Sequence, residues 1–203
     1  MDKVSETVMA AEVDHRLMQE FANGDPRAFE LLYQKYKGGL YRYFIRQIGD
    51  KQLAEDLYQE TWARVIKAAA GYERRAKFTT WLYRIAHNLL IDHVRALKPV
   101  ELFSDAAIEG EPINDGQPCM QYAPEQLTTQ GQKATILKEC IALLPHVQKE
   151  AFLLNMEMGF TAVVIAEVAG AGLEAIKSRL RYATQSLKQC VEGKWQEQHY
   201  DTK

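Results

Sequence analysis

Cysteine is scarce in this sequence of 203 residues, where it occurs only at Cys119, Cys140 and Cys190. An odd number of cysteines without a Cys-x-x-Cys pair argues against a disulfide framework and against a cysteine-rich metal site. We therefore expect all three to be free thiols, which are typical of a reducing compartment.

Long apolar runs are also missing. No stretch of roughly 18 apolar residues could span a bilayer, and the N-terminus has no basic segment followed by an apolar one. These absences predict a cytoplasmic protein without membrane insertion.

The sequence has little net charge, and its formal value is -2. That value argues against a uniformly basic nucleic-acid-binding protein, but the charges are strongly segregated. Residues 72–98 hold six Lys or Arg and two acids, whereas residues 99–132 hold six acids and no Lys or Arg. Local charge is therefore more informative than the total.

Residue patterns typical of enzymes are absent. His87 and His93 are six residues apart and do not share a helical face, and no carboxylate pair or thiol stands beside them at metal-ligand spacing. No glycine-rich phosphate loop is present. We expect no catalytic residues, no metal site and no cofactor.

Apolar residues recur at the three- and four-residue spacing of helices, and no convincing alternating strand pattern interrupts them. Asp25-Pro26 is a helix start, and Gly38-Gly39 should kink the helix that follows or divide it in two. We predict an all-α chain of two small helical domains joined by a flexible acidic linker. The predicted boundaries are an N-terminal segment without a strong pattern at 1–19, an N-terminal domain at 20–98, the linker at 99–131, a C-terminal domain at 132–193 and a tail at 194–203.

One stretch, from Tyr72 to Arg95, combines cations with aromatic rings. It begins as a basic loop between Tyr72 and Phe78 and continues as a helix whose exposed face carries Arg84 and Asn88. Cations contact phosphates and rings stack on unpaired bases, so this stretch suits melted nucleic acid. A solvated face beside a buried Trp81 explains the same pattern, and the two interpretations stay open at this point.

A second nucleic-acid pattern lies between Phe160 and Ala183. Thr161 is placed to cap a short helix with Ile165 and Val168 inside, a small-residue turn follows, and a second helix buries Leu173, Ile176, Leu180 and Ala183. This is the spacing of a helix-turn-helix, whose second helix enters the major groove. An ordinary helical hairpin with a charged outer face is the alternative.

These residues resemble the sigma-70 family of bacterial RNA polymerase sigma factors, and the short two-domain plan resembles its extracytoplasmic-function (ECF) class. The resemblance rests on A-E-D-L-Y-Q-E-T-W, on F-T-T-W-L-Y-R-I-A-H-N-L-L-I-D-H-V-R and, further along, on I-K-S-R-L-R-Y-A. It covers about residues 20–97 and 132–192. Val163 and Val164 stand where the family carries acids, so the capping box from Thr161 is lost.

The resemblance implies that the protein binds core RNA polymerase and promoter DNA, helps melt the minus-ten element, and is a target for an anti-sigma factor. The implied contacts fall into three sets. They are Asp56, Gln59 and Glu60 for the polymerase; Tyr72, Arg74, Arg75, Lys77, Phe78, Arg84, Asn88 and Arg95 for the minus-ten element; and Glu174, Lys177, Ser178 and Arg181 for the minus-thirty-five element.

Two other functions remain open from the sequence. An autonomous helix-turn-helix regulator would explain the C-terminal domain but not the basic loop or the acidic segment before it. A protein-interaction module that no longer touches DNA is the third possibility. Within the sigma-factor interpretation, we expect the pocket for a flipped base in the loop between Tyr72 and Phe78 rather than at Trp81.

Overall fold

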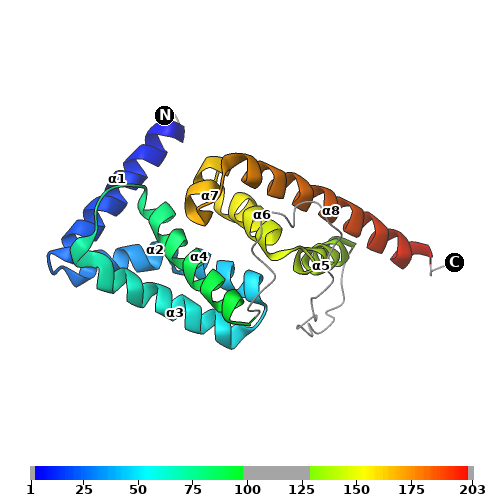
Figure 1. Cartoon of the computed structure of the whole chain (residues 1–203), viewed down its shortest axis with the longest axis horizontal. Coiled ribbons are helices and arrows are strands. Elements are labelled where there is room, and N and C mark those ends of the chain that lie inside the picture. Colours follow the sequence, from blue (N-terminus) through cyan, green and yellow to red (C-terminus); the bar gives the residue numbers. More distant parts are fainter. Residues whose placement is uncertain (1–2, 98–128, 201–203) are drawn as a thin grey trace. The chain divides into compact units, whose positions relative to one another are not determined.

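The computed structural model describes residues 3–97 and 129–200, and every element in those ranges is helical (Figure 1). The all-α prediction is therefore confirmed for this part of the chain. In order, the elements are α1 (Lys3–Ala22), α2 (Pro26–Ile48), α3 (Lys51–Ala68), the 3-10 turn η1 (Ala69–Gly71), α4 (Phe78–Leu97), α5 (Thr129–Ala142), α6 (His146–Met158), α7 (Ala162–Ala169) and α8 (Leu173–Tyr200). None of the described helices is long and apolar enough to cross a membrane.

The helices form two compact units. The first contains α1 to α4, and the second contains α5, α6, the greater part of α7 and α8. Most of the predicted acidic linker lies outside the described residues, because the description stops at residue 97 and resumes at Thr129. The tail predicted from residue 194 continues as α8 as far as Tyr200.

Local sequence signals set the ends of α2 and α3. Asp25 caps α2 by accepting a hydrogen bond from the backbone N–H of Arg27, and Pro26 occupies the first turn. Gly49, at φ 81°, ends α2 in the left-handed conformation that glycine adopts without strain. Asp50 then caps α3 by accepting from the Leu53 N–H at 2.8 Å. A turn this short brings α3 back along α2.

The glycine pair at Gly38-Gly39 does not divide α2, which is one continuous helix from Pro26 to Ile48. Leu32, Leu40 and Phe44 flank the pair and are fully buried. The burial of these side chains offsets the intrinsic cost of glycine in a helix, about 1 kcal/mol per residue.

The helix α1 packs against α2, and α3 packs against both α2 and α4. The core between them is made by Met18, Leu32, Leu40, Phe44, Ala54, Val65, Phe78, Leu82, Ala86 and Leu90. The boundary predicted at residue 20 therefore lies within α1, whose Leu17 and Met18 are part of this core.

In the second unit, α5 and α6 both pack against α8. Ile136, Cys140, Leu144, Ala183 and Leu187 form the centre of its core. Because α5 and α8 are far apart in the sequence, this core joins the two ends of the unit.

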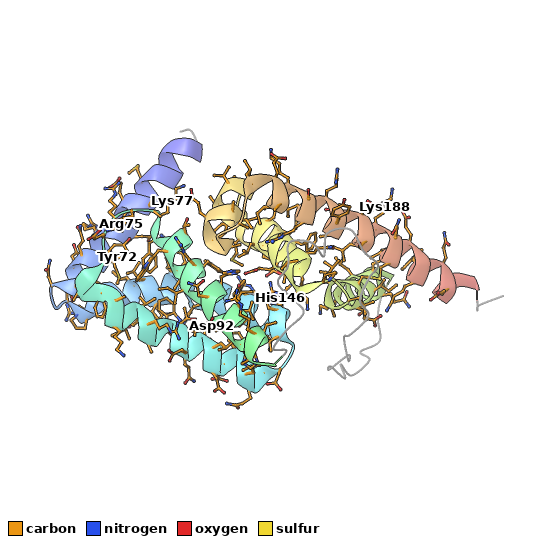
Figure 2. All side chains as sticks on the ribbon, in the orientation of Figure 1. Tyr72, Arg75, Lys77, Asp92, His146 and Lys188 are labelled. Atoms are coloured by element: carbon orange, nitrogen blue, oxygen red, sulfur yellow. A yellow bond between two sulfur atoms is a disulfide. The ribbon has the colours of Figure 1, made fainter. Side chains whose placement is uncertain are left out.

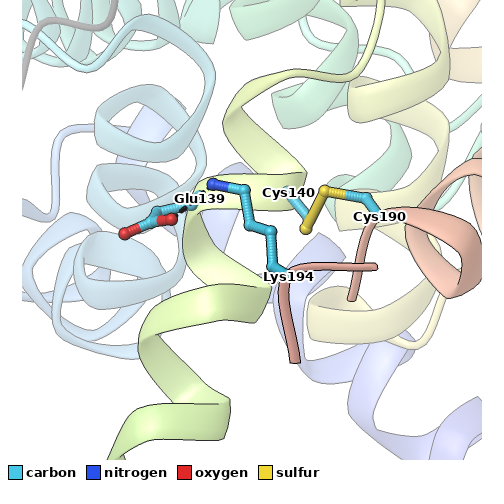
Figure 3. Close-up of a disulfide and its surroundings, with 4 residues drawn as sticks. All are labelled: Glu139, Cys140, Cys190 and Lys194. Carbon is cyan, nitrogen blue, oxygen red and sulfur yellow. Dashed lines mark hydrogen bonds and ion pairs between the residues drawn. A yellow bond between two sulfur atoms is a disulfide. The ribbon is translucent and has the colours of Figure 1, made fainter. Parts of the chain in front are cut away.

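A disulfide joins Cys140 of α5 to Cys190 of α8, with an S–S distance of 2.04 Å and a Cα–Cα distance of 5.9 Å (Figure 3). The expectation of three free thiols was therefore wrong for this pair. The two residues are 50 apart in the sequence, and only the packing of α5 on α8 brings them together. Beside the disulfide, Lys194 donates to Glu139 at 2.5 Å and links the same two helices.

Candidate nucleic-acid interface

The basic loop before α4 is anchored at its first residue. Tyr72 is half-buried, and its ring packs against Trp81 with ring centroids 5.0 Å apart. Its hydroxyl lies 2.5 Å from Nδ1 of His15 in α1. Burial, followed by the negative charge of Asp14, raises the pKa of the Tyr72 phenol to about 12, so the phenol is protonated at neutral pH.

The cations of this loop differ in how they are engaged. Arg74 forms a two-pronged ion pair with Glu12 of α1, one hydrogen bond of which measures 2.7 Å. Arg75 pairs with its neighbour Glu73 through Nε at 2.7 Å. The Lys77 side chain is exposed, and its backbone carbonyl accepts from the Trp81 N–H at 3.1 Å. Tyr72, Arg75 and Lys77 lie together in the segment that leads into α4 (Figure 2).

Phe78 does not offer a face to a base in this structure. It was predicted as a DNA contact, but its side chain is 0% exposed and packs against Tyr36, Tyr72 and Trp81. The reason is the start of α4: the helix begins at Phe78 itself, so the first side chain after the loop turns into the core. Trp81 is half-buried beside it, so the ring is only partly core.

The outer face of α4 carries Arg84, Asn88 and Arg95, and all three are exposed. They project from the side of the helix opposite its buried Leu82, Ala86 and Leu89. The basic loop leads directly into α4, so the loop and this polar helix face belong to the same unit.

An acidic face lies on α3. Asp56, Gln59 and Glu60 are exposed as predicted, while Ala54 and Val65 are buried. Glu60 accepts from Arg64 at 2.9 Å on the same helix. Glu55 is also exposed and adjoins these residues. The sequence prediction omitted Glu55, although its spacing of four from Gln59 places it on the same side.

In the second unit, α7 and α8 are joined by a short turn in which Gly170 adopts φ 60°. Thr161 accepts from the Val164 N–H at 3.4 Å, a long capping bond, and Gly172 accepts the first backbone bond of α8 from Ile176 at 3.1 Å. Ile165, Val168 and Ile176 are buried as predicted, but Leu173 is 37% exposed because it is the first residue of α8.

The predicted DNA-reading residues lie on the first turns of α8. Glu174, Lys177 and Arg181 are exposed, and Ser178 is half-buried. Lys177 donates to Glu174 at 2.6 Å, and the Arg181 guanidinium lies 4.9 Å from the centre of the Tyr182 ring. Both contacts are local and solvent-exposed, so they hold the cations only weakly against a phosphate.

Comparison with known proteins finds similarity to sigma factors. Residues 32–99 match the family model of sigma-70 region 2. The chain is 26% identical over 189 residues to the RNA polymerase sigma-H factor of Pseudomonas aeruginosa, covering 91% of this chain and 97% of that protein. It is 26% identical over 179 residues to the ECF RNA polymerase sigma factor SigW of Bacillus subtilis, covering 84% of this chain and 92% of that protein. Together these matches support an ECF-class sigma factor of the sigma-70 family.

Solved structures agree with this fold. CnrH, solved in complex with the cytosolic domain of CnrY, superimposes with a TM-score of 0.64 at 20% identity, covering 89% of this chain and 98% of that one. The sigma factor RpoE of Bartonella quintana, solved with the anti-sigma factor NepR, gives a TM-score of 0.62 at 21% identity, covering 81% of this chain and 96% of that one.

The family model begins at residue 32 and therefore spans the acidic face of α3, the basic loop and α4 of this sigma factor. It does not include α1, from which Glu12 and His15 reach the loop. The sequence analysis missed both residues. Their partners are about 60 positions away, and no periodic pattern signals such a contact.

Proposed function

We propose that this sigma factor binds core RNA polymerase, directs it to specific promoters and helps to melt the minus-ten region. The observation that carries the proposal is the arrangement of the first unit. Its acidic face on α3 and its exposed basic loop with the outer face of α4 are separate surfaces on one folded body. A protein that must hold a polymerase and a DNA strand at once needs two such surfaces of opposite charge.

The acidic face is the proposed polymerase contact. Asp56, Gln59 and Glu60, together with Glu55, are exposed and would suit a basic partner surface. Charge reversal of Asp56 to Arg should weaken binding to core polymerase strongly. Glu30→Arg is the matched control, because Glu30 is an exposed acid on α2, outside the acidic face.

The loop and α4 are the proposed minus-ten contact. Lys77, Arg84 and Asn88 are exposed and suited to phosphates and unpaired base edges. Arg75 and Arg95 add cations at the two ends of this region. Extruding a base costs a few kcal/mol, which a pocket and stacking must offset. Because Phe78 is buried, we propose that the exposed part of the loop between Tyr72 and Phe78 forms this pocket.

The start of α8 is the proposed reader of the minus-thirty-five element. Glu174, Lys177, Ser178 and Arg181 lie where a recognition helix presents its side chains to a major groove. Lys177→Ala and Arg181→Ala should each weaken duplex binding. If each side chain contacts one phosphate, each variant should also reduce the slope of the logarithm of the binding constant against the logarithm of the salt concentration by about one unit. Lys188→Ala is the matched control, because Lys188 is an exposed cation further along the same helix (Figure 2).

We propose an anti-sigma factor as a further partner, since the RpoE structure of the same fold was solved with one. We also propose that the protein acts in the cytoplasm, where bacterial polymerase and chromosome are found, and has no catalytic activity of its own.

The deciding experiment is transcription with purified core polymerase on genomic DNA, followed by mapping of RNA 5′ ends. Transcripts that begin at a shared promoter motif only when the protein is added would support the proposal. Tight binding to duplex DNA without any such transcript would instead favour an autonomous helix-turn-helix regulator. The absence of both activities would favour a protein-interaction module.

A further inference from the structure

Within one turn of α1, three side chains reach two other parts of the first unit. Asp14 contacts α2, while Glu12 and His15 contact the basic loop. This turn lies before the region matched by the family model, which begins at residue 32. The contacts are therefore features of this chain that the family model does not contain.

Asp14 fixes α1 on α2. The carboxylate is 3% exposed and accepts hydrogen bonds from Lys35 Nζ at 2.5 Å and from the Tyr36 hydroxyl. Burial and the hydrogen bond to Asp14 raise the pKa of Tyr36, which keeps the phenol protonated as the donor. A buried carboxylate with two donors leaves little freedom in how α1 lies along α2.

His15 connects this anchored helix to the loop. It is 5% exposed, and its Nδ1 lies 2.5 Å from the Tyr72 hydroxyl. Burial and the nearby Arg74 lower the pKa of His15, while Glu12 and Asp14 oppose that shift. The imidazole is thus neutral at neutral pH, and its Nδ1 and the Tyr72 hydroxyl share one hydrogen bond.

Tyr72, which His15 contacts, in turn packs against the start of α4. The Tyr72 ring packs against Trp81, with ring centroids 5.0 Å apart, and against Phe78, with ring centroids 6.4 Å apart. Two residues along the loop, Glu12 holds the guanidinium of Arg74. The first half of the loop is therefore attached to α1, while Lys77 in its second half remains exposed.

We propose that His15, supported by Glu12, is a positioning residue for strand opening. Through Tyr72 it holds the basic loop so that the segment from Arg75 to Lys77 is presented to the melted strand. The residue itself touches no DNA, and its effect is on the step that separates strands rather than on binding to closed duplex. This inference rests on the proposed function, in which the loop captures the minus-ten strand.

Loop docking can be measured without DNA or polymerase, because trypsin cleaves after Arg74, Arg75 and Lys77. His15→Ala and Tyr72→Phe each remove the hydrogen bond, and we expect cleavage in the loop to accelerate about 3- to 10-fold. The double variant should be no faster than either single variant, because both remove the same contact. His15→Asn should restore slow cleavage, since its side-chain oxygen takes nearly the position of Nδ1.

Two further variants control for unfolding and for general effects of mutating α1. Glu12→Gln changes a half-exposed side chain, so the fold should survive, and cleavage after Arg74 should rise as its guanidinium is released. Arg16→Ala alters the exposed neighbour of His15, which faces Glu20 on its own helix, and should cleave like the wild type. Unchanged loop cleavage in His15→Ala, Tyr72→Phe and Glu12→Gln would overturn the proposal.

Strand opening is then followed by permanganate footprinting on a duplex promoter, and binding to the closed duplex is measured in parallel at low temperature. We expect His15→Ala and Tyr72→Phe to open the duplex about 3- to 10-fold more slowly, with little change in closed-duplex binding or in affinity for core polymerase. Equal loss of closed-duplex binding and of opening, or faster cleavage with normal opening, would refute the positioning role. If the wild-type protein itself opens no promoter, it is the proposed function that fails.

Discussion

The disulfide between Cys140 and Cys190 should make the second unit far more stable in its oxidised form than in its reduced form. The bond closes a loop across 50 residues and joins α5 to α8, the two ends of the unit. Both sulfurs belong to the apolar cluster around Ile136 and Leu144, and Cys140 is 1% exposed. Reduced thiols are small and apolar enough to stay packed there. Reduction therefore acts mainly on the unfolded state, whose conformational entropy rises when the cross-link is removed.

The size of the effect follows from loop closure. For a loop of about 50 residues, the entropy model gives about 4 kcal/mol at 25 °C, and measured values for removing native disulfides fall at about 2–5 kcal/mol. In a small domain, 2–4 kcal/mol corresponds to a fall in melting temperature of roughly 10–30 °C. In a cytoplasm that keeps thiols reduced, the second unit would therefore be markedly less stable than its oxidised form.

The assay is thermal unfolding of the full chain followed by circular dichroism, with and without a phosphine reductant. Two transitions are expected, because α1–α4 and α5–α8 belong to separate compact units, and only one should move. Hydrogen exchange should assign the moving transition to α5 and α8. Differential alkylation and mass spectrometry establish beforehand which cysteines are bonded.

Two variants provide the controls. In Cys119→Ala, reductant should still lower the melting temperature of the second unit. In the double variant Cys140→Ala/Cys190→Ala, that melting temperature should equal the value of the reduced wild type, and reductant should not change it. If oxidised and reduced protein melt together while alkylation proves the bond present, the loop-entropy reasoning is wrong for this unit.

Three other predictions concern stability. Asp50→Ala should lose the cap on the Leu53 N–H and about 1 kcal/mol of unfolding free energy in a urea titration, whereas Asp50→Asn should retain most of it. Leu154→Ala should cost about 2–5 kcal/mol because this side chain is 0% exposed, while Leu143→Ala, at 57% exposed, should cost little by the same measurement. Because burial and Arg74 lower the pKa of His15, the unfolded state binds a proton more readily, so stability should be complete above about pH 6.5 and fall below it. His15→Asn should flatten that part of the pH profile, and an unchanged slope would show that another group is responsible.

Much of the fold follows from local sequence signals. Asp25-Pro26 and Gly49-Asp50 set helix ends through hydrogen bonds and dihedral angles within a few residues, so they can be recognised without knowing the fold. The helical period likewise predicted an all-α chain, the segregated charge predicted a basic stretch at residues 72–98, and the family resemblance pointed to Asp56, Gln59 and Glu60 on α3. At Gly38-Gly39 the local signals left one helix or two open, and the structure has one continuous helix there.

Contacts between distant helices could not be predicted in this way. The pairing of Cys140 with Cys190 needs α5 packed on α8, and an odd cysteine count suggested free thiols instead. The burial of Phe78 depends on where α4 begins. Because the helix starts at Phe78, this ring lies in the core rather than among the DNA contacts predicted from the sequence.

The sequence by itself determined the helical class, the family and the faces on which charged residues lie, because these depend on residue type and on a spacing of three or four. Only the tertiary structure decided how the basic loop is held. His15 and Glu12 lie about 60 positions from Tyr72 and Arg74, and α1 brings them within hydrogen-bonding distance because Asp14 anchors that helix to α2. Such a contact depends on the positions of three helices at once, and no single stretch of sequence encodes it.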